Sequence, residues 1–270
     1  MTGDFQLLLF STNAALIGAA VAAGVKGIIV DWERAGKHAR QAGADTQINS
    51  DTLDDLRRVR ASTTALVICR INGFSDATPR EVEDATAAGA DEILLPMVRS
   101  VREVEGVLDL VRGRCGVGIM IETVAATRIA SDLARLPLSR VYVGLNDLAI
   151  DRRAPNIFTA VADGTVERMR SHFTCRFGFG GLTLPDCGAP IPCRLLIAET
   201  ARLGCSFGFL RRSFLRDIQG RDMAVEVPRL LIALEQARTR DSDQVRRDRL
   251  ALERAIATWP AGPSIGREAA

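Results

Sequence analysis

Short apolar runs alternate along most of the chain with amphipathic or alanine-rich stretches. The apolar runs end at turn-forming or polar residues, which is typical of buried parallel strands. Eight runs are predicted as strands: Gln6–Phe10, Gly27–Asp31, Ala65–Ile71, Glu92–Leu95, Gly116–Ile121, Arg140–Leu145, Arg176–Gly180 and Ser206–Leu210. The stretches between them are predicted as helices: Ala14–Ala23, Thr52–Arg60, Pro79–Ala88, Val101–Arg112, Ala125–Leu136, Ile157–Ser171 and Pro192–Leu203.

This alternation predicts an α/β fold, a single (β/α)8 TIM barrel with an additional C-terminal helical extension. The rival fold is an open doubly wound sheet, but no GxGxxG motif opens a helix after the first strand. Two more helices are predicted, Val227–Arg238 and Ser242–Thr258, and the second exceeds what a barrel needs. We therefore expect a catalytic barrel over residues 1–240, and a C-terminal helix and tail over 241–270 that contacts another subunit of a homo-oligomer.

Composition excludes several classes of partner. A net charge of +2 gives no reason to expect nucleic acid or an anionic membrane. No apolar segment reaches the roughly 20 residues needed to span a bilayer. The start, Met1-Thr2-Gly3-Asp4, lacks the basic flank of a signal peptide, so we expect a cytoplasmic protein.

Cysteine and lysine usage narrows the chemistry. The six cysteines show no CxxC pair, and we expect reduced packing residues rather than disulfides or metal ligands. Only two lysines occur, Lys26 and Lys37, against 33 arginines. An imine-forming enzyme needs a buried lysine near its substrate. Lys26 precedes a predicted strand and Lys37 lies in a loop, so neither fits that role.

Two acidic residues stand where predicted strands end. Glu122 follows the run Gly116–Ile121, and Asp147 follows the run that includes Val141–Asn146. Because a helix connects these strands, they are parallel neighbours about 4.8 Å apart, with both carboxylates at the same carboxyl edge. Two carboxylates that close either repel each other or share a cation. With no histidine or cysteine beside them, they favour Mg²⁺ or Mn²⁺.

Such a metal would suit a 2-oxo acid as substrate. Mg²⁺ held by one or two carboxylates keeps several waters, which substrate oxygens can replace. The ion would then stabilise an enolate while a carbon–carbon bond breaks or forms. Arg70, at the end of a nearby strand, would hold the ketone oxygen or a carboxylate as a charged fork. The alternatives are helix N-capping for Glu122 or Asp147 and a plain salt bridge for Arg70.

Other polar residues follow the same predicted edge. The second strand leads into Trp32, Glu33 and His38. We take Glu33 and His38 as candidate catalytic groups and Trp32 as a rim aromatic that contacts substrate, while a solvated loop position is the alternative for His38. Pro96 and Thr123, after the fourth and fifth strands, are candidate substrate contacts.

A glycine and arginine corner lies after the last two predicted strands. Gly180, Gly181 and Arg211 stand where barrels often bind phosphate, so they are candidates for holding an anionic part of the substrate. The alternative is that these glycines only allow tight packing.

Several of these segments together resemble a known family. They are Val30-Asp31-Trp32-Glu33, Cys69-Arg70-Ile71-Asn72, Ala90–Val98, Ile121-Glu122-Thr123 and Gly144-Leu145-Asn146-Asp147-Leu148. In this order they are similar to the HpcH/HpaI aldolase and citrate lyase beta-subunit family, over roughly residues 24–149. The resemblance implies a phosphoenolpyruvate/pyruvate-type barrel, a divalent metal on Glu122 and Asp147, and Arg70 on the enolate oxygen. It also implies oligomers that pack or exchange the last helix.

The sequence departs from the family pattern at two places. Family aldolases that act on free hydroxy-oxo acids carry a Glu-His pair after the second strand, with the histidine as acid/base, and citrate-lyase-like members carry Glu-Asp. Here that position is Arg34. The glycine expected shortly after the metal aspartate is replaced by Ile150-Asp151-Arg152-Arg153. The metal half of the site therefore matches the family, whereas the proton-transfer half does not.

These observations predict a metal-dependent carbon–carbon lyase, aldolase or synthase that acts through an enolate of a 2-oxo acid such as pyruvate, or of an acyl thioester. Two alternatives remain. One is a phosphoenolpyruvate-type enzyme with a phosphate-bearing substrate at the glycine corner. The other is a barrel that binds a ligand without turnover, since the usual acid/base is missing.

Overall fold

The computed structural model describes residues 5–34, 51–210 and 212–259. Nine parallel strands form one sheet in the order β7-β6-β5-β4-β3-β2-β1-β9-β8. The strands are β1 (Gln6–Phe10), β2 (Gly27–Asp31), β3 (Leu66–Arg70), β4 (Glu92–Leu95), β5 (Gly116–Ile121), β6 (Arg140–Val143), β7 (Arg176–Phe179), β8 (Gly181–Leu182) and β9 (Phe207–Leu210).

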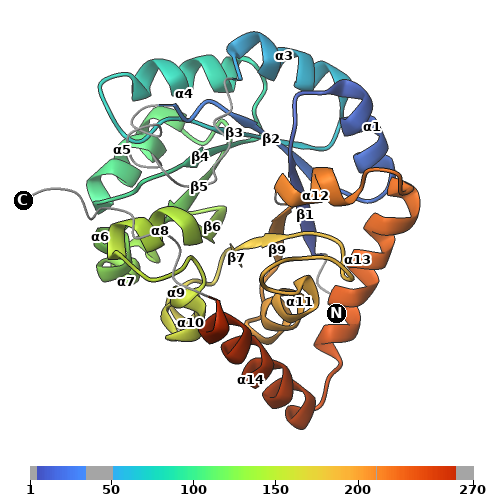
Figure 1. The fold of residues 1–270 in the computed structure, drawn as a ribbon. Helices are drawn as coiled ribbons and strands as arrows, with labels where there is room; N and C mark the ends of the chain where they lie inside the picture. Colours follow the sequence, from blue (N-terminus) through green and yellow to red (C-terminus); the bar gives the residue numbers. More distant parts are fainter. Residues whose placement is uncertain (1–4, 35–50, 211, 260–270) are drawn as a thin grey trace, which may run out of the picture.

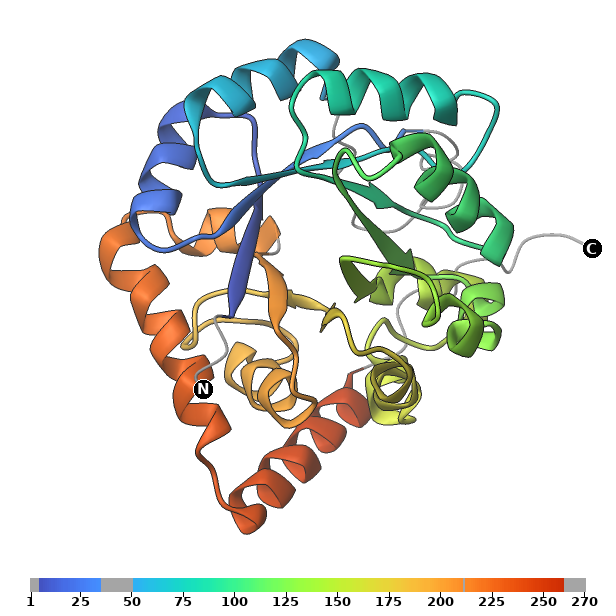
Figure 2. The same ribbon diagram turned by 180° about the vertical axis from the view of Figure 1, so that it is seen from behind.

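Helices surround this sheet, as Figure 1 shows and Figure 2 confirms from behind. They are α1 (Ala14–Ala22), α3 (Leu53–Ser62), α4 (Thr78–Ala87), α5 (Val101–Val111), α6 (Val124–Arg128), α7 (Ala130–Leu133), α8 (Leu145–Arg152), α9 (Thr159–Ala162), α10 (Thr165–His172), α11 (Cys193–Arg202), α12 (Arg212–Asp217), α13 (Met223–Arg238) and α14 (Ser242–Thr258).

The two ends of the sheet come from one broken strand. β7 and β8 are separated by Gly180, whose φ of 59° turns the chain in a way that favours glycine. β8 pairs with β9 at Gly181 and Phe209, and the Ser206 N–H donates to the Phe177 carbonyl of β7 at 2.9 Å. These contacts nearly close the ring. The predicted α/β barrel with C-terminal helices is confirmed.

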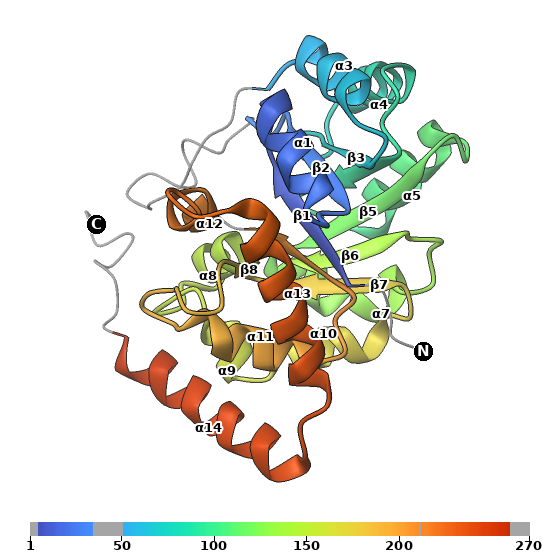
Figure 3. The ribbon, with the colours of Figure 1, turned by 90° about the vertical axis from the view of Figure 1, so that its right-hand side faces the viewer.

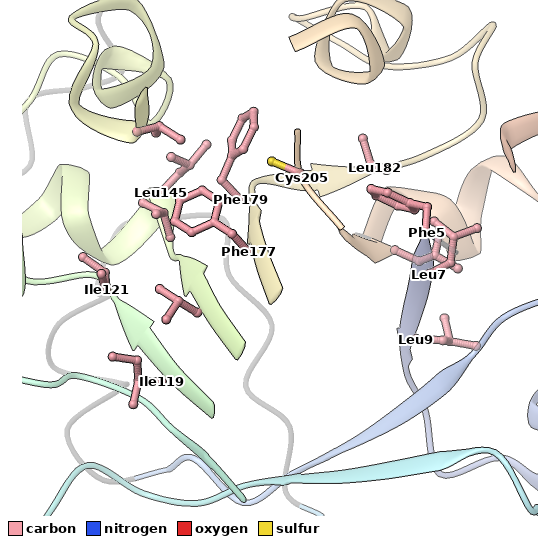
Figure 4. Packing of buried hydrophobic residues seen from close by; sticks show 14 of the residues in the cluster. Phe5, Leu7, Leu9, Ile119, Ile121, Leu145, Phe177, Phe179, Leu182 and Cys205 are labelled. Atoms are coloured by element: carbon pink, nitrogen blue, oxygen red, sulfur yellow. The ribbon is translucent and has the colours of Figure 1, made fainter. Parts of the chain in front are cut away.

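Alternate residues of each strand point into or out of the barrel. The inner side chains form their own apolar cluster: Leu8, Ile29, Ile68, Leu94, Met120, Tyr142, Phe207 and Phe209. The outward residues pack beneath the helices, and Figure 4 shows Leu7 and Leu9 of β1 and Ile119 and Ile121 of β5 within this outer cluster. Two residues past Ile29, Ile68 and Met120, strand alternation places three polar residues on the inner face at the carboxyl end. They are Asp31, Arg70 and Glu122.

A buried ion pair lies at the opposite, amino-terminal end of the barrel. Arg140 of β6 donates from Nε to Glu92 of β4 across the intervening strand, and both side chains are nearly inaccessible. Gly118 on β5 makes room for the pair, since a Cβ there would lie 2.6 Å from Glu92 Oε1. The Arg140 guanidinium also lies 4.8 Å from the centre of the Phe207 ring. Burial raises the pKa of Glu92, while Arg140 opposes that change.

Some element boundaries differ from the sequence prediction. The predicted helix Ala125–Leu136 is divided into α6 and α7, and Ile157–Ser171 into α9 and α10. The sixth strand ends at Val143 instead of Leu145, because Gly144 serves as the N-cap of α8. Asp147 therefore lies in the first turn of a helix rather than directly after a strand.

The last helix packs on its own chain. Arg249 of α14 donates to the Val161 carbonyl at 3.0 Å and forms an ion pair with the buried Glu199 of α11. Figure 3 shows α14 following α13 at the periphery of the barrel. The division at residue 240 and the role of this helix as an oligomer contact stay predictions. Within the described residues, no helix is long and apolar enough to cross a membrane.

The cysteines and the described lysine have defined places in the fold. All six cysteines are free thiols, and Cys69, Cys193 and Cys205 are buried. Lys26 is exposed and directly precedes β2, at the amino edge of the sheet. Lys37 lies outside the described residues.

Candidate functional site

Arg70 and Asp31 meet at the inner carboxyl end of the barrel. They are direct partners in the register of β2 and β3. Arg70 donates from Nε to Asp31 Oδ1 at 2.8 Å and from Nη2 to Oδ2 at 2.6 Å. Asp31 is fully buried, and the Arg70 side chain is 12% exposed. Burial alone would lower the pKa of Arg70, but the carboxylates of Asp31 and Glu33 raise it above its ordinary value, so the guanidinium stays charged.

The remaining edge of the Arg70 guanidinium faces the barrel axis. Its Nη1 lies 3.2 Å from Glu33 Oε2 and 3.7 Å from the Met120 sulfur. Glu33 is 2% exposed, and its backbone N–H donates to Asp31 Oδ1 at 3.2 Å. The Phe10 ring covers the guanidinium at 5.1 Å from its centre. Asp31, Glu33 and the Phe10 ring therefore hold the Arg70 guanidinium in one orientation.

Glu122 enters the same space from the end of β5. Its Oε1 accepts the Met97 N–H at 2.8 Å, and Met97 holds a positive φ of 54°. Such a backbone conformation is uncommon outside glycine and clusters at functional sites. On the other side, Oε2 lies against Gly144, where a Cβ would come within 2.3 Å of it. The carboxylate is therefore clamped between the β4 loop and the start of α8.

Negative charges outweigh positive charges around Glu122. Burial, together with the charges of Glu33 and Asp147, raises the pKa of Glu122 to about 8, against the opposing effects of Arg70 and the Met97 N–H. Asp147, in the first turn of α8 and partly exposed, is thus electrostatically close to Glu122. The N-cap positions belong to Thr123 for α6 and Gly144 for α8, so neither carboxylate is an N-cap.

The donor set fits a hard divalent cation. Asp31, Glu33 and Glu122 bring three carboxylates to one Arg70, and Asp147 adds its charge beside Glu122. A buried excess of negative charge needs protons or a cation. Among the described residues, no three His, Cys, Asp or Glu side chains converge as a complete ligand cage. Two carboxylates with bound waters are nevertheless the usual way in which proteins hold Mg²⁺. Glu122 and Asp147 would be those ligands.

The other predicted contact residues have defined partners. The Thr123 hydroxyl accepts the Ala126 N–H at 3.0 Å and donates to the Val98 carbonyl at 2.5 Å. Trp32 is buried, and its Nε1–H donates to the Thr52 carbonyl at 3.1 Å. Pro96 is also buried in the loop after β4. Their roles as substrate contacts stay predictions.

The predicted glycine corner is partly described. The Gly180 carbonyl accepts the Tyr142 hydroxyl at 2.5 Å, and Gly181 begins β8. Gly180 thus has a structural role, because it turns the chain between β7 and β8. His38 and Arg211 lie outside the described residues, and anion binding at this corner stays a prediction.

Arg34, at the position where family aldolases carry histidine, is held at the rim. Its backbone N–H donates to Asn72 Oδ1 at 2.8 Å, and its Nη2 donates to the Asp51 carbonyl at 2.7 Å. Arg34 is exposed, unlike its buried neighbour Glu33. With Trp32 and Asn72, it lines a cavity of about 330 Å³ between the β2 and β3 ends. Glu33, the residue before Arg34, forms an ion pair with Arg70.

Asp31, Met97 and Gly144 contribute to the site in ways that the sequence pattern did not reveal. Asp31 stood in the family-like segment and ended a predicted strand, but its pairing with Arg70 depends on the register of β2 and β3. Met97 acts through its backbone N–H, and Gly144 makes room for Glu122 because it has no Cβ. That both residues face Glu122 follows from the tertiary fold and cannot be read from residue type.

Comparisons with known proteins identify the family and support the fold. The profile of the family described as HpcH/HpaI aldolase/citrate lyase matches residues 5–156. A comparison with curated proteins gave no match. The crystal structure of citrate synthase SbnG is similar, with a TM-score of 0.59 and 18% identity over 80% of this chain and 91% of that chain. RipC from Yersinia pestis gives 0.58 and 15% identity over 91% of this chain and 100% of that chain. At these identities the two structures support the fold alone.

Proposed function

The chain belongs to the HpcH/HpaI aldolase/citrate lyase family, and from this premise we propose that it is a divalent-metal-dependent carbon–carbon lyase or aldolase, or a synthase in the reverse direction. Its substrate would be a small carboxylate that passes through an enolate, either a 2-oxo acid such as pyruvate or an acyl thioester. The observation that supports the proposal is one fixed arginine, Arg70, which contacts Asp31 and Glu33 at the inner carboxyl end of the barrel. The buried Glu122 lies within electrostatic reach of Arg70, Glu33 and Asp147.

Glu122 and Asp147 would hold Mg²⁺ or Mn²⁺. A divalent cation there supplies a Lewis acid that stabilises the negative charge of an enolate. Glu122 is prepared for this role, because the Met97 N–H fixes one oxygen and Gly144 leaves space for the other. Its raised pKa also means that a cation replaces a proton, so binding becomes tighter with pH up to about 8.

Arg70 would bind the oxygen that becomes negative. Asp31 engages Nε and Nη2, which leaves Nη1 as the donor directed toward the axis, where it now contacts Glu33. A preorganised charged donor of this kind stabilises developing charge without having to reorient. Lysine cannot reproduce the arrangement, because it lacks the planar fork that two Asp31 oxygens require.

Glu33 is our candidate for moving the proton. It is buried next to Arg70, whereas Arg34 extends to the Asp51 carbonyl. In the cleavage direction, the Glu33 carboxylate would take the proton of the substrate hydroxyl as the carbon–carbon bond breaks. The hydroxyl carbon becomes a carbonyl group, and the electron pair of the broken bond forms the enolate. Glu33 would then give that proton to the enolate carbon, which yields the second product and restores the Glu33 carboxylate. The reverse transfer would start the condensation.

Deuterium exchange tests this function even while the second substrate is unidentified. The protein is incubated with Mg²⁺ and a panel of 2-oxo acids in D2O, and proton NMR follows loss of the signal next to the ketone. We expect exchange with at least one acid, its loss in Glu122→Gln and Arg70→Lys, and its retention in the exposed-site control Asp76→Asn. Absence of exchange across the panel would favour a barrel that binds a ligand without turnover.

A further inference from the structure

A hydrogen bond joins the two segments that carry the proposed metal ligands. Asp151 lies on α8, one turn after Asp147, so the two side chains leave the same side of the helix. Its Oδ2 accepts the Val124 N–H at 2.6 Å. Val124 is the first residue of α6 and follows Glu122 by two positions.

This bond lies where the sheet no longer holds the two segments together. The register of β5 and β6 ends at Ile121 and Val143, and a last backbone bond runs from Gly144 N to the Ile121 carbonyl at 3.1 Å. Glu122 and Asp147 both lie beyond this point. The separation of their carboxylates therefore depends on contacts outside the strand ladder.

The contact joins the exposed carboxylate of Asp151 to a backbone N–H at the start of α6. The first N–H groups of a helix have no partner within the helix, and the helix N-terminus favours negative charge. A carboxylate that accepts such an N–H forms a short, charge-assisted bond. Asp151 thereby ties the start of α6 to the end of α8.

The same end of α8 has a second anchor. Arg152 forms an ion pair with Asp163 and donates from Nη1 to Thr165 Oγ1 at 3.2 Å, which connects α8 to the start of α10. Asp151 and Arg152 both belong to the stretch Ile150-Asp151-Arg152-Arg153, which departs from the family pattern. Through their contacts, this stretch holds the helix that carries Asp147 at two points.

We propose that Asp151 is a positioning residue for the Glu122 and Asp147 metal site, an inference that rests on the proposed function. It acts through the Val124 N–H, which fixes the segment after Glu122 against α8 and so sets the spacing of the two ligands. It does not ligate the ion. Residues that support metal ligands in this indirect way typically change metal affinity by about 10–100-fold when removed.

The test is a set of Mn²⁺ titrations followed by electron paramagnetic resonance on the full chain. Asp151→Ala removes both the acceptor and the charge, whereas Asp151→Asn keeps an acceptor oxygen and removes only the charge. Titrations in about 1 M KCl, where the Debye length is about 3 Å, screen the charge contribution. Asp222→Ala is the matched control, because Asp222 accepts the Ala224 N–H at 2.8 Å at the start of α13.

Under these conditions we expect Asp151→Ala to weaken Mn²⁺ binding at least tenfold. Asp151→Asn should stay within about threefold of the wild type, and Asp222→Ala should bind as the wild type does. Equal binding by Asp151→Ala and the wild type would overturn the positioning role. So would equal weakening by both Asp151 variants, or by Asp222→Ala. A wild-type protein that binds no Mn²⁺ would instead overturn the proposed function, and this inference with it.

Discussion

Replacing Glu122 by glutamine should change how the stability of the metal-free protein depends on pH. The folded protein raises the pKa of Glu122 from 4.5 to about 8, because the side chain is buried beside Glu33 and Asp147. The folded state therefore binds this proton more tightly than the unfolded chain does. The resulting stabilisation is complete below pH 4.5 and is lost as the pH rises through 8.

The size of the effect follows from the same values. One pKa unit corresponds to about 1.4 kcal/mol, so the wild type should lose about 5 kcal/mol between pH 4 and pH 9 through this group. Glutamine resembles the protonated carboxyl group and does not titrate. Metal-free Glu122→Gln should therefore match the wild type at pH 4 and exceed it by about 5 kcal/mol at pH 9, which raises the midpoint of thermal unfolding by about 10 °C or more.

Thermal unfolding followed by circular dichroism in EDTA, from pH 4 to pH 9, measures this difference. Glu105→Gln, at an exposed position of α5, serves as the control and should leave the profile unchanged. A difference between wild type and Glu122→Gln that is constant across this range would refute the reasoning. It would mean that Glu122 is not held as a buried carboxyl group in the folded protein.

Two further variants test the packing around the barrel ends. In calorimetric titrations, Gly144→Ala should weaken Mn²⁺ binding at least tenfold, because the new Cβ would lie 2.3 Å from Glu122 Oε2. The backbone itself tolerates alanine, since φ at this position is −79°. Gly18→Ala, with no atom within 4 Å of its Cβ, should bind as the wild type does. Glu92→Leu should lower the free energy of unfolding in urea by about 3–5 kcal/mol, because Arg140 is left buried without its carboxylate. Adding Arg140→Leu to Glu92→Leu should recover much of the lost free energy of unfolding. If the double variant recovers none of it, Glu92 does not stabilise the fold by pairing with Arg140.

The strands could be predicted well because the signal is local. Apolar runs such as Gly116–Ile121 are buried in a parallel sheet on both faces, so burial and strand boundaries coincide. The same argument brought Glu122 and Arg70 to one edge of the sheet. Alternation of short strands and helices then left the barrel as the favoured fold.

The features that could not be predicted depend on tertiary contacts. Gly180 divides the seventh strand because the chain must turn there before β8 pairs with β9. Gly144 ends β6 early and lets α8 begin, which moves Asp147 into a helix. The pairing of Asp31 with Arg70 needs the register of β2 and β3, and strand lengths alone do not fix that register.

The most direct test of the metal site is a calorimetric titration of the metal-free protein with Mn²⁺ at pH 8. The account predicts one ion per chain in the wild type. It also predicts a loss of affinity of about 100-fold in both Glu122→Gln and Asp147→Asn, and wild-type binding in Asp76→Asn, which removes an exposed carboxylate near the same rim. Unchanged Mn²⁺ affinity in Glu122→Gln and Asp147→Asn would contradict the account.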